Sequence, residues 1–315
     1  MGKRAFVFPG QGSQQVGMGQ GAFKEWPEAR EVFERAGAAL NEDMAALCFN
    51  GPQERLTLTE NAQPALLTVS SALYQVLASR GLAPDFVAGH SLGEYSALVA
   101  AGVISLEDGV RAVRLRGRFM QEAVPPGEGG MAALMGLSRG QVEELCAQVS
   151  SETGRVVEPA NFNSPQQIVV SGHRDAVLRL MDAAKEAGCR RAVELKVSAP
   201  FHCSLMRPAQ ERLAGVLGEI AFSEPAFPVL PNVTAEPVSD GHTLRELLVR
   251  QVTAPVLWQS SVERMVEEGV SLFVEVGAGK VLSGLVKKTN RKVKTVAFGG
   301  PEDLESVLKT WEEHQ

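Results

Sequence analysis

The sequence predicts an α/β protein built on a parallel sheet, and three segments support this class. A short apolar run at residues 5–8 stops at a Pro-Gly pair, which predicts a buried strand ended by a turn. A second short apolar run at 86–88 precedes a glycine-flanked serine. The apolar segment at 95–103 is too long for a strand and predicts a helix. Strands that alternate with helices are typical of a parallel sheet covered by helices.

The remaining elements of this larger part are predicted from the same patterns. Residues 62–82 are predicted to form a helix between the first two strands, and residues 110–120 a helix after the serine. Near the C-terminus we expect a helix at 211–220 and strands at 229–233 and 272–276.

A linker rich in proline and glycine spans residues 125–130. After it, the order of predicted strands and helices differs from that of the larger part. The segments after it are predicted as strand 131–135, helix 138–149 capped by Ser138, strands 156–160 and 167–171, helix 175–187 ended by Gly188, and strand 192–197. This β-α-β-β-α-β order is the ferredoxin-like pattern. We therefore expect a small domain at 129–197 inserted into a large domain made of 1–128 and 198–315.

The composition narrows the class of partner. The chain has 315 residues, 44% of them hydrophobic, and a net charge of −6, which argues against a nucleic-acid partner. No apolar stretch approaches the roughly 20 residues of a membrane span, and the first apolar run is too short for a signal peptide. The four cysteines form no CxxC pair, so we expect neither a zinc site nor a disulfide framework. Free cysteines fit a protein of the reducing cytoplasm.

The first candidate for chemistry is Ser91, in the segment Gly89-His90-Ser91-Leu92-Gly93. The G-x-S-x-G spacing lets the chain turn sharply between a strand and a helix, so that the serine hydroxyl is exposed. A serine hydroxyl is a weak nucleophile until a neighbouring base takes its proton. A tight turn with a capping serine has the same pattern, so these five residues alone leave both interpretations open.

Five histidines are available as the base, and His202 is the best placed of them. His314 lies in the polar tail, His173 and His242 sit beside glycines in loop-like stretches, and the elbow turn directs the side chain of His90 elsewhere. His202 follows the last strand of the predicted small domain, where the chain returns to the large one. A histidine there can project into a cleft between the domains. By position alone, a surface or core histidine remains the alternative.

The glycine-rich loop at residues 10–14 is not a phosphate-binding loop. The dinucleotide fingerprint needs a third glycine where Gln15 stands, and a Walker loop needs a lysine where Met18 stands. These mismatches disfavour a nucleotide-binding oxidoreductase. The loop can instead supply donors for an oxyanion, through Gln11 and main-chain N–H groups.

Arg116 lies inside the apolar arc of the helix predicted at 110–120, between Val113 and Met120. The arginines at positions 111, 114 and 118 share another arc. A guanidinium keeps its charge, so Arg116 needs an anionic partner when buried. That partner is either an Asp or Glu of the chain, which position alone favours, or a substrate carboxylate held by two hydrogen bonds.

With these residues in view, the sequence resembles the bacterial malonyl-CoA:acyl carrier protein transacylases over essentially its full length. Each matching stretch is short, but their joint order is specific. The stretches are Phe8-Pro9-Gly10-Gln11-Gly12-Ser13-Gln14, Gly89-His90-Ser91-Leu92-Gly93-Glu94, Arg114-Leu115-Arg116-Gly117, Asn163-Ser164-Pro165, Pro200-Phe201-His202, Arg250-Gln251, Pro255-Val256 and Glu275-Val276-Gly277. One departure is Ala278, where the family usually has proline, away from the proposed chemistry.

The resemblance implies a role for each candidate residue. Ser91 is acylated, His202 is its base, and the main-chain carbonyl of Gln251 orients the imidazole in place of a triad carboxylate. The main-chain N–H groups of Gln11 and Leu92 form the oxyanion hole.

Two further residues are implied in substrate binding. Arg116 binds the malonyl carboxylate, and Phe201 matches the malonyl-selective members of the family. The implied fold is an α/β-hydrolase-like core with a ferredoxin-like insert.

The implied reaction is ping-pong transfer of malonyl from malonyl-CoA to the phosphopantetheine thiol of acyl carrier protein, with no metal or other cofactor. We expect a cytoplasmic monomer that supplies fatty acid biosynthesis, although polyketide synthesis uses the same transfer. Two other classes stay open: a hydrolase or thioesterase on the same elbow, and an acyl-binding module without catalysis.

Overall fold

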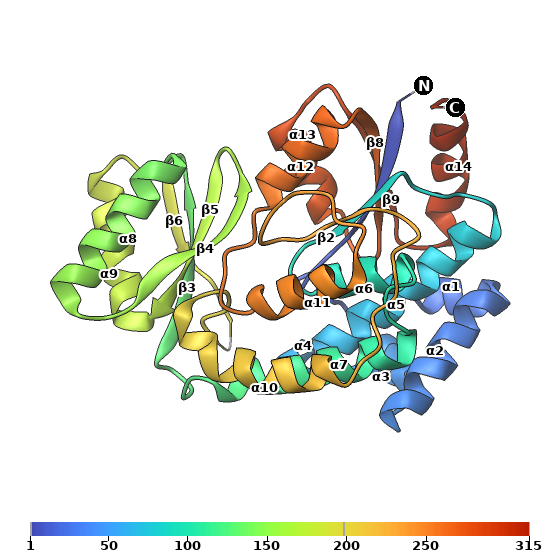
Figure 1. Ribbon diagram of the computed structural model, residues 1–315, viewed down its shortest axis with the longest axis horizontal. Helices are drawn as coiled ribbons and strands as arrows, with labels where there is room; N and C mark the ends of the chain where they lie inside the picture. The colour runs from blue at the N-terminus through green and yellow to red at the C-terminus, as the bar shows by residue number, and fades with distance from the viewer. Residues whose placement is uncertain (1, 198, 315) are drawn as a thin grey trace.

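The computed structural model describes residues 2–197 and 199–314. These residues form a five-stranded sheet in the order β7-β2-β1-β8-β9 and a four-stranded sheet in the order β4-β5-β3-β6. Figure 1 shows the four-stranded sheet with α8 and α9 at one end of the molecule, apart from the larger sheet. All neighbouring strands of the larger sheet run parallel, so the predicted α/β class with a parallel sheet is confirmed.

The parallel sheet is buried on both faces. Its strands are β1 (Lys3–Phe8), β2 (Phe86–Gly89), β7 (Val229–Leu230), β8 (Val270–Val276) and β9 (Lys294–Phe298). On β1, Phe6 and Phe8 belong to one core cluster and Ala5 and Val7 to another. Because side chains alternate across a strand and helices cover both faces, the strand is an unbroken apolar run rather than an alternating one.

Helices pack against both faces of the parallel sheet and around it. They are α1 (Gln20–Glu25), α2 (Pro27–Leu40), α3 (Met44–Asn50), α4 (Gln53–Thr57), α5 (Thr59–Ser79), α6 (Gly93–Ala100), α7 (Leu106–Glu122), α10 (Arg207–Gly218), α11 (Gly241–Arg250), α12 (Trp258–Glu267), α13 (Val281–Thr289) and α14 (Leu304–Glu312). No helix in the described ranges combines the length and apolar composition needed to cross a bilayer.

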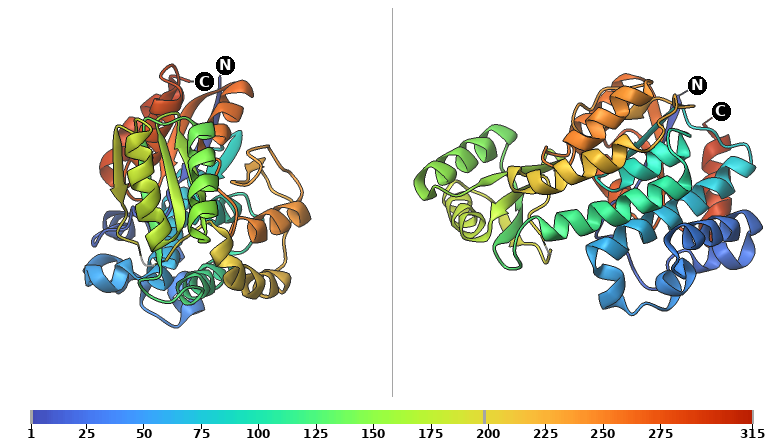
Figure 2. Two further views of the ribbon diagram at one scale, coloured as in Figure 1. Left: turned by 90° about the vertical axis from the view of Figure 1, so that its left-hand side faces the viewer. Right: turned by 60° about the horizontal axis from the view of Figure 1, so that its bottom comes forward.

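The smaller sheet is antiparallel and has a helix-covered face. Its part of the chain runs β3 (Gly129–Met135), α8 (Arg139–Thr153), β4 (Val157–Ser164), β5 (Gln167–His173), α9 (Arg174–Glu186) and β6 (Arg191–Glu194). Leu134 and Val170 pack in the cluster under α8 and α9, whereas Met131 and Ala133 belong to the core of the larger part. In the right-hand view of Figure 2 the two helices lie together on one side of this sheet.

Some predicted boundaries are wrong. Strand β7 has two residues instead of the five predicted at 229–233, because Pro231 has no N–H to donate and the next residue turns toward the site. Strand β6 ends at Glu194, and the chain of Lys196 and Val197 leaves the sheet to line a cavity. Helices α1–α4 and α11–α14 and strand β9 were not predicted.

Candidate active site

Ser91 stands in a sharp turn directly between β2 and α6, with a left-handed φ of 52°. The glycines on either side are needed because the main chain folds back on itself. A Cβ on Gly89 would lie 1.9 Å from the main-chain carbon of Gly93, and one on Gly93 would lie 2.0 Å from the carbonyl oxygen of Phe8. The G-x-S-x-G spacing is therefore a steric requirement of this turn.

Asn232 fixes the turn from the neighbouring strand. Its Oδ1 accepts the main-chain N–H of Ser91 at 2.7 Å, and its Nδ2 donates to the carbonyl of Gly89 at 2.7 Å. Asn232 follows β7 at the edge of the sheet where β2 also ends, because the two strands are parallel neighbours. Sequence reasoning missed this residue; the available signal was a polar side chain two residues after a buried strand.

The hydroxyl of Ser91 and the imidazole of His202 form a hydrogen-bonded pair. Ser91 Oγ lies 2.7 Å from His202 Nε2, and His202 Nδ1 lies 2.9 Å from the main-chain oxygen of Gln251. A carbonyl oxygen only accepts, so Nδ1 carries the proton and Nε2 is free to accept one from the serine. Three residues far apart in sequence thus form one hydrogen-bonded chain.

Burial keeps His202 neutral. The residue is 3% exposed, and desolvation, together with the nearby charge of Arg116, lowers its pKa to about 3. A neutral imidazole is the form that accepts a proton from a serine hydroxyl.

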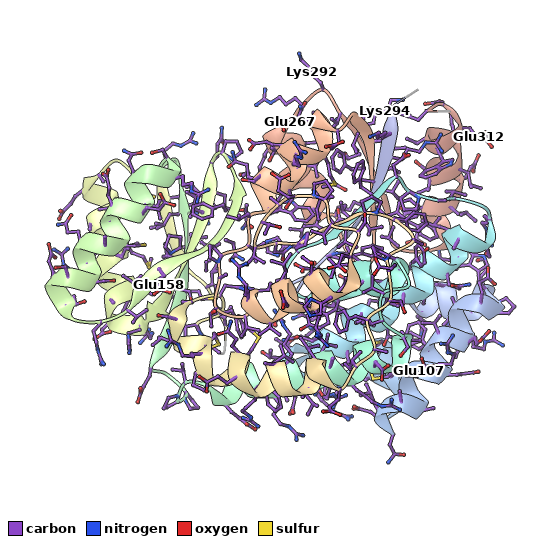
Figure 3. The ribbon with its side chains drawn as sticks, in the orientation of Figure 1. Glu107, Glu158, Glu267, Lys292, Lys294 and Glu312 are labelled. Carbon is purple, nitrogen blue, oxygen red and sulfur yellow. The ribbon has the colours of Figure 1, made fainter. Side chains whose placement is uncertain are left out.

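The main chain two residues after His202 is hydrogen-bonded to the smaller sheet. Glu158, on β4, accepts the N–H of Ser204 at 2.7 Å and its hydroxyl at 2.8 Å. Figure 3 labels Glu158 on this sheet, close to the start of α10. His202 itself has a left-handed φ of 60°, so the bonds of its own side chain and of Ser204 hold a strained residue in place.

Arg116 reaches the same hydroxyl from α7. Its Nη2 donates to Ser91 Oγ at 3.1 Å and to Gln251 Oε1 at 3.0 Å, and its Nη1 donates to Gln63 Oε1 at 2.7 Å. The side chain is 2% exposed. No carboxylate of the described residues lies within 4.0 Å of it, so the ion pair within the chain that position alone favoured is absent there.

Arg116 consequently holds a positive charge that only neutral groups contact. Burial lowers its pKa, but a guanidinium stays charged in proteins. Its Nε has no hydrogen-bond partner among the described residues, and the ring centroid of Tyr95 lies 5.6 Å from its Cζ. The geometry fits an anion that enters from outside.

Gln11 and Leu92 line the cavity in front of Ser91. Within the described chain, the main-chain N–H groups of these two residues donate to no acceptor, which leaves both free for a ligand oxygen. Gln11 follows β1 and Leu92 follows β2, and the ends of these strands meet because Phe8 pairs with Gly89.

The cavity lies between the two sheets. Met131 and Asn161 of the smaller sheet line one side, and Arg116 and Ser91 line the other. Phe201, 9% exposed, also lines it. No group of His, Cys, Asp and Glu within residues 2–197 and 199–314 is arranged to hold a metal ion.

A parallel sheet with a strand-to-helix elbow, carrying a Ser–His pair beside a free guanidinium, defines a serine acyltransferase type of site. The family model described as "Acyl transferase domain" matches residues 5–302. The malonyl CoA-acyl carrier protein transacylase of Escherichia coli (strain K12) is 49% identical over 306 residues, which cover 97% of this chain and 98% of that one.

Two further comparisons agree. The malonyl CoA-acyl carrier protein transacylase of Bacillus subtilis (strain 168) is 47% identical over 313 residues, which cover 99% of this chain and 98% of that one. A solved structure described as a type II PKS acyl-carrier protein in complex with its malonyl-transacylase has a TM-score of 0.95 at 44% identity, covering 98% of this chain and 99% of that one. The chain belongs to the malonyl CoA-acyl carrier protein transacylase family.

Proposed function

We propose that this protein transfers the malonyl group of malonyl-CoA to the phosphopantetheine thiol of acyl carrier protein, through a malonyl ester on Ser91, and so supplies fatty acid biosynthesis. One observation carries the proposal: Ser91 Oγ lies between the Nε2 of His202 and the Nη2 of Arg116. A base and an unpaired cation on the same hydroxyl suit an acyl group that ends in a carboxylate.

The first half-reaction forms the ester. His202 Nε2 takes the proton as Ser91 Oγ attacks the thioester carbonyl, and the main-chain carbonyl of Gln251 stabilises the imidazolium. The oxyanion accepts hydrogen bonds from the N–H groups of Gln11 and Leu92. The C–S bond then breaks, and His202 returns its proton to the sulfur of CoA.

The second half-reaction runs the same steps with another thiol. The phosphopantetheine thiol gives its proton to His202 and attacks the ester carbonyl, and the Ser91 oxygen leaves with that proton. Both thiols use one cavity in turn, which is a ping-pong mechanism. The solved complex that contains an acyl-carrier protein supports such a partner.

Selectivity for malonyl rests on Arg116 and Phe201. The carboxylate of the acyl group takes up the free hydrogen-bonding capacity of the guanidinium, whose present partners are neutral. Phe201 lines the cavity together with His202, and its large ring is proposed to disfavour a branch on the acyl chain. Holding the ester carboxylate also fixes the carbonyl for thiol attack rather than hydrolysis.

The architecture proposed is an α/β-hydrolase-like large domain at 1–128 and 198–315 with a ferredoxin-like small domain at 129–197. The sheet order β4-β5-β3-β6 and its βαββαβ connection support the insert. We propose a monomer that needs no metal or cofactor of its own. Four cysteines, all free, support a cytoplasmic location.

Intact-mass measurement after incubation with malonyl-CoA tests this function. We expect wild type to gain one malonyl group and to lose it when phosphopantetheinylated acyl carrier protein is added. Ser91→Ala should gain none, whereas Ser96→Ala, which alters a buried serine on α6, should behave as wild type. An adduct that persists in Ser91→Ala would refute the nucleophile. Release of free malonate at the rate of transfer would identify a hydrolase instead.

A further inference from the structure

Glu94 is a fully buried carboxyl group within the site, three residues after Ser91 in the first turn of α6. Its Oε2 accepts the main-chain N–H of Asn232 at 2.8 Å and the Nε2 of Gln251 at 2.8 Å. Its Oε1 has no hydrogen-bond partner among the described residues. The mechanism above makes no use of this group.

The side chain of Gln251 joins Glu94 to Arg116. Its Nε2 donates to Glu94 and to the carbonyl of Ser91, and its Oε1 accepts from Arg116 Nη2. The amide is therefore held with its nitrogen toward the carboxyl group and its oxygen toward the guanidinium. Because the amide is buried, the charges at its two ends are weakly screened and interact strongly.

We propose that Glu94 is a specificity-determining residue that, through Gln251, sets how strongly Arg116 holds the carboxylate of the acyl group on Ser91. This inference rests on the proposed malonyl transfer. An ionised Glu94 balances the charge of Arg116, so a second anion beside the guanidinium is disfavoured. A neutral Glu94 leaves the guanidinium uncompensated, and the substrate carboxylate then supplies the missing charge.

Proton binding and malonyl binding are consequently coupled. Burial raises the pKa of Glu94 to about 7, against the opposing effect of its hydrogen bonds and of Arg116. The group therefore changes charge near neutral pH. A malonyl carboxylate on Arg116 raises this pKa further, and a proton on Glu94 raises malonyl affinity by the same factor. The additional proton comes from solvent.

The charged surroundings of Glu94 leave Arg116 as its main electrostatic neighbour. α6 packs against β1, β2, α5 and α7. On α6 itself the adjacent titratable side chain is Tyr95, whose pKa burial raises. His202 lies on the far side of Gln251. The other charged or titratable side chains of β1, α5 and α7 contact groups elsewhere: Lys3 with Glu268, Arg4 with Trp311, Glu60 with Arg118, Tyr74 with Phe6 and Phe8, Glu107 with Arg35, Arg111 with Asp108, Arg114 with Glu42, and Glu122 with Arg212.

The test is the ratio of kcat/KM for malonyl-CoA to kcat/KM for acetyl-CoA, measured from pH 5.5 to 8.5. The ratio cancels the ionisation of groups that act on both substrates, and the malonyl carboxylate stays ionised over this range. In wild type we expect the ratio to fall by about fivefold or more as pH rises, the lower end of common couplings between two sites. In Glu94→Gln, which is neutral at every pH, the ratio should stay at the high value that wild type has at low pH.

Glu275→Gln is the matched control. Glu275 is also 0% exposed and accepts two main-chain N–H groups, from Leu282 and Ser283, but at the start of α13 rather than at the site. It should lose stability yet keep the wild-type dependence on pH. A flat ratio in wild type, or a ratio in Glu94→Gln that still falls with pH, would overturn the role of Glu94. Absence of any malonyl adduct on wild type would instead refute the proposed function.

A second measurement needs only wild type, in case Glu94→Gln does not fold. In weak buffer at pH 7, acylation with malonyl-CoA should take up a fraction of a proton per Ser91 that acylation with acetyl-CoA does not. Release of CoA is common to both reactions and cancels. Equal proton uptake with the two substrates would contradict the coupling.

Discussion

Arg116 on α7 donates a hydrogen bond to the hydroxyl of Ser91 over 3.1 Å, although the two residues are 25 positions apart and Ser91 lies in the turn before α6. The same oxygen faces His202, so its proton points to the imidazole while its lone pair faces a cation. A cation beside the oxygen favours the anion that forms as the proton leaves. The guanidinium thus contacts Ser91, the proposed nucleophile, and, as proposed, the acyl carboxylate that later arrives.

This contact predicts that Arg116→Ala reduces malonyl transfer much more than acetyl transfer. Loss of a buried, hydrogen-bonded charge pair costs about 2–5 kcal/mol, and an acetyl group has no carboxylate to lose. Arg114→Ala is the control, since Arg114 lies on the same helix and pairs with Glu42 away from the cavity. Measured kcat/KM values that drop equally for both substrates would refute the carboxylate clamp.

Ser91 and Arg116 were predictable because each contradicts its local pattern. A serine between two glycines after a strand, and an arginine in the apolar arc of a helix, are visible within a few residues. Gln63, which accepts from Arg116, carries a weaker signal, as an amide directly before the apolar run of α5.

Asn232 and Glu94 were not assigned a role because their partners lie far along the chain. The bond from Ser91 to Asn232 spans 141 positions. Strand β7, which places Asn232, is two residues long and too short for a periodic pattern. Such contacts depend on the order of strands in the sheet, which local sequence does not encode.

The hydrogen bonds of Asn232 predict that removing its side chain lowers the free energy of unfolding. Asn232→Ala removes the hydrogen bonds from the Ser91 N–H and to the Gly89 carbonyl, and a buried polar group that loses its partner costs about 1–3 kcal/mol. We expect chemical denaturation to show a clear decrease in the free energy of unfolding and slower acylation of Ser91. Asn290→Ala, which removes only a bond in the exposed turn before β9, should change stability by about 0.5 kcal/mol or less. Similar losses of stability in the two variants would show that Asn232 does not stabilise the turn at Ser91.

The low pKa of His202 predicts that activity does not fall near pH 6.5, where an ordinary histidine becomes protonated. Its pKa of about 3 lies below the ordinary 6.5, so the neutral base persists as pH falls. The kcat/KM for acetyl-CoA, which avoids the charge of a malonyl group, should therefore stay level from pH 8 to about 5. Half-maximal activity near pH 6.5 would show that the imidazole titrates normally.

The depressed pKa of His202 also fixes the sign of its effect on folding. Below pH 6.5 this histidine binds a proton in the unfolded chain but not in the folded one. Its contribution to stability therefore decreases as pH falls.

The partner surface supplies the last prediction. The resemblance implies a strongly acidic acyl carrier protein, and Arg190 and Arg191 are exposed at the start of β6, where with Lys288 they line a second cavity. In the described structure neither arginine is in an ion pair, so both are free to attract an acidic protein. Transfer of malonyl to acyl carrier protein should slow as salt is added, because exposed charges are screened within about 10 Å at 0.1 M.

Arg191→Glu should lower the rate of that transfer and flatten its dependence on salt, because electrostatic steering acts mainly on the rate of association. Arg179→Glu on α9, which pairs with Glu152, should leave both unchanged. Transfer to free pantetheine separates docking from chemistry, since this acceptor is small and uncharged and should respond to neither salt nor the variant. If transfer to acyl carrier protein is indifferent to salt, or if the two charge reversals act alike, the partner binds elsewhere, and the arginines at the edge of β6 have no part in docking.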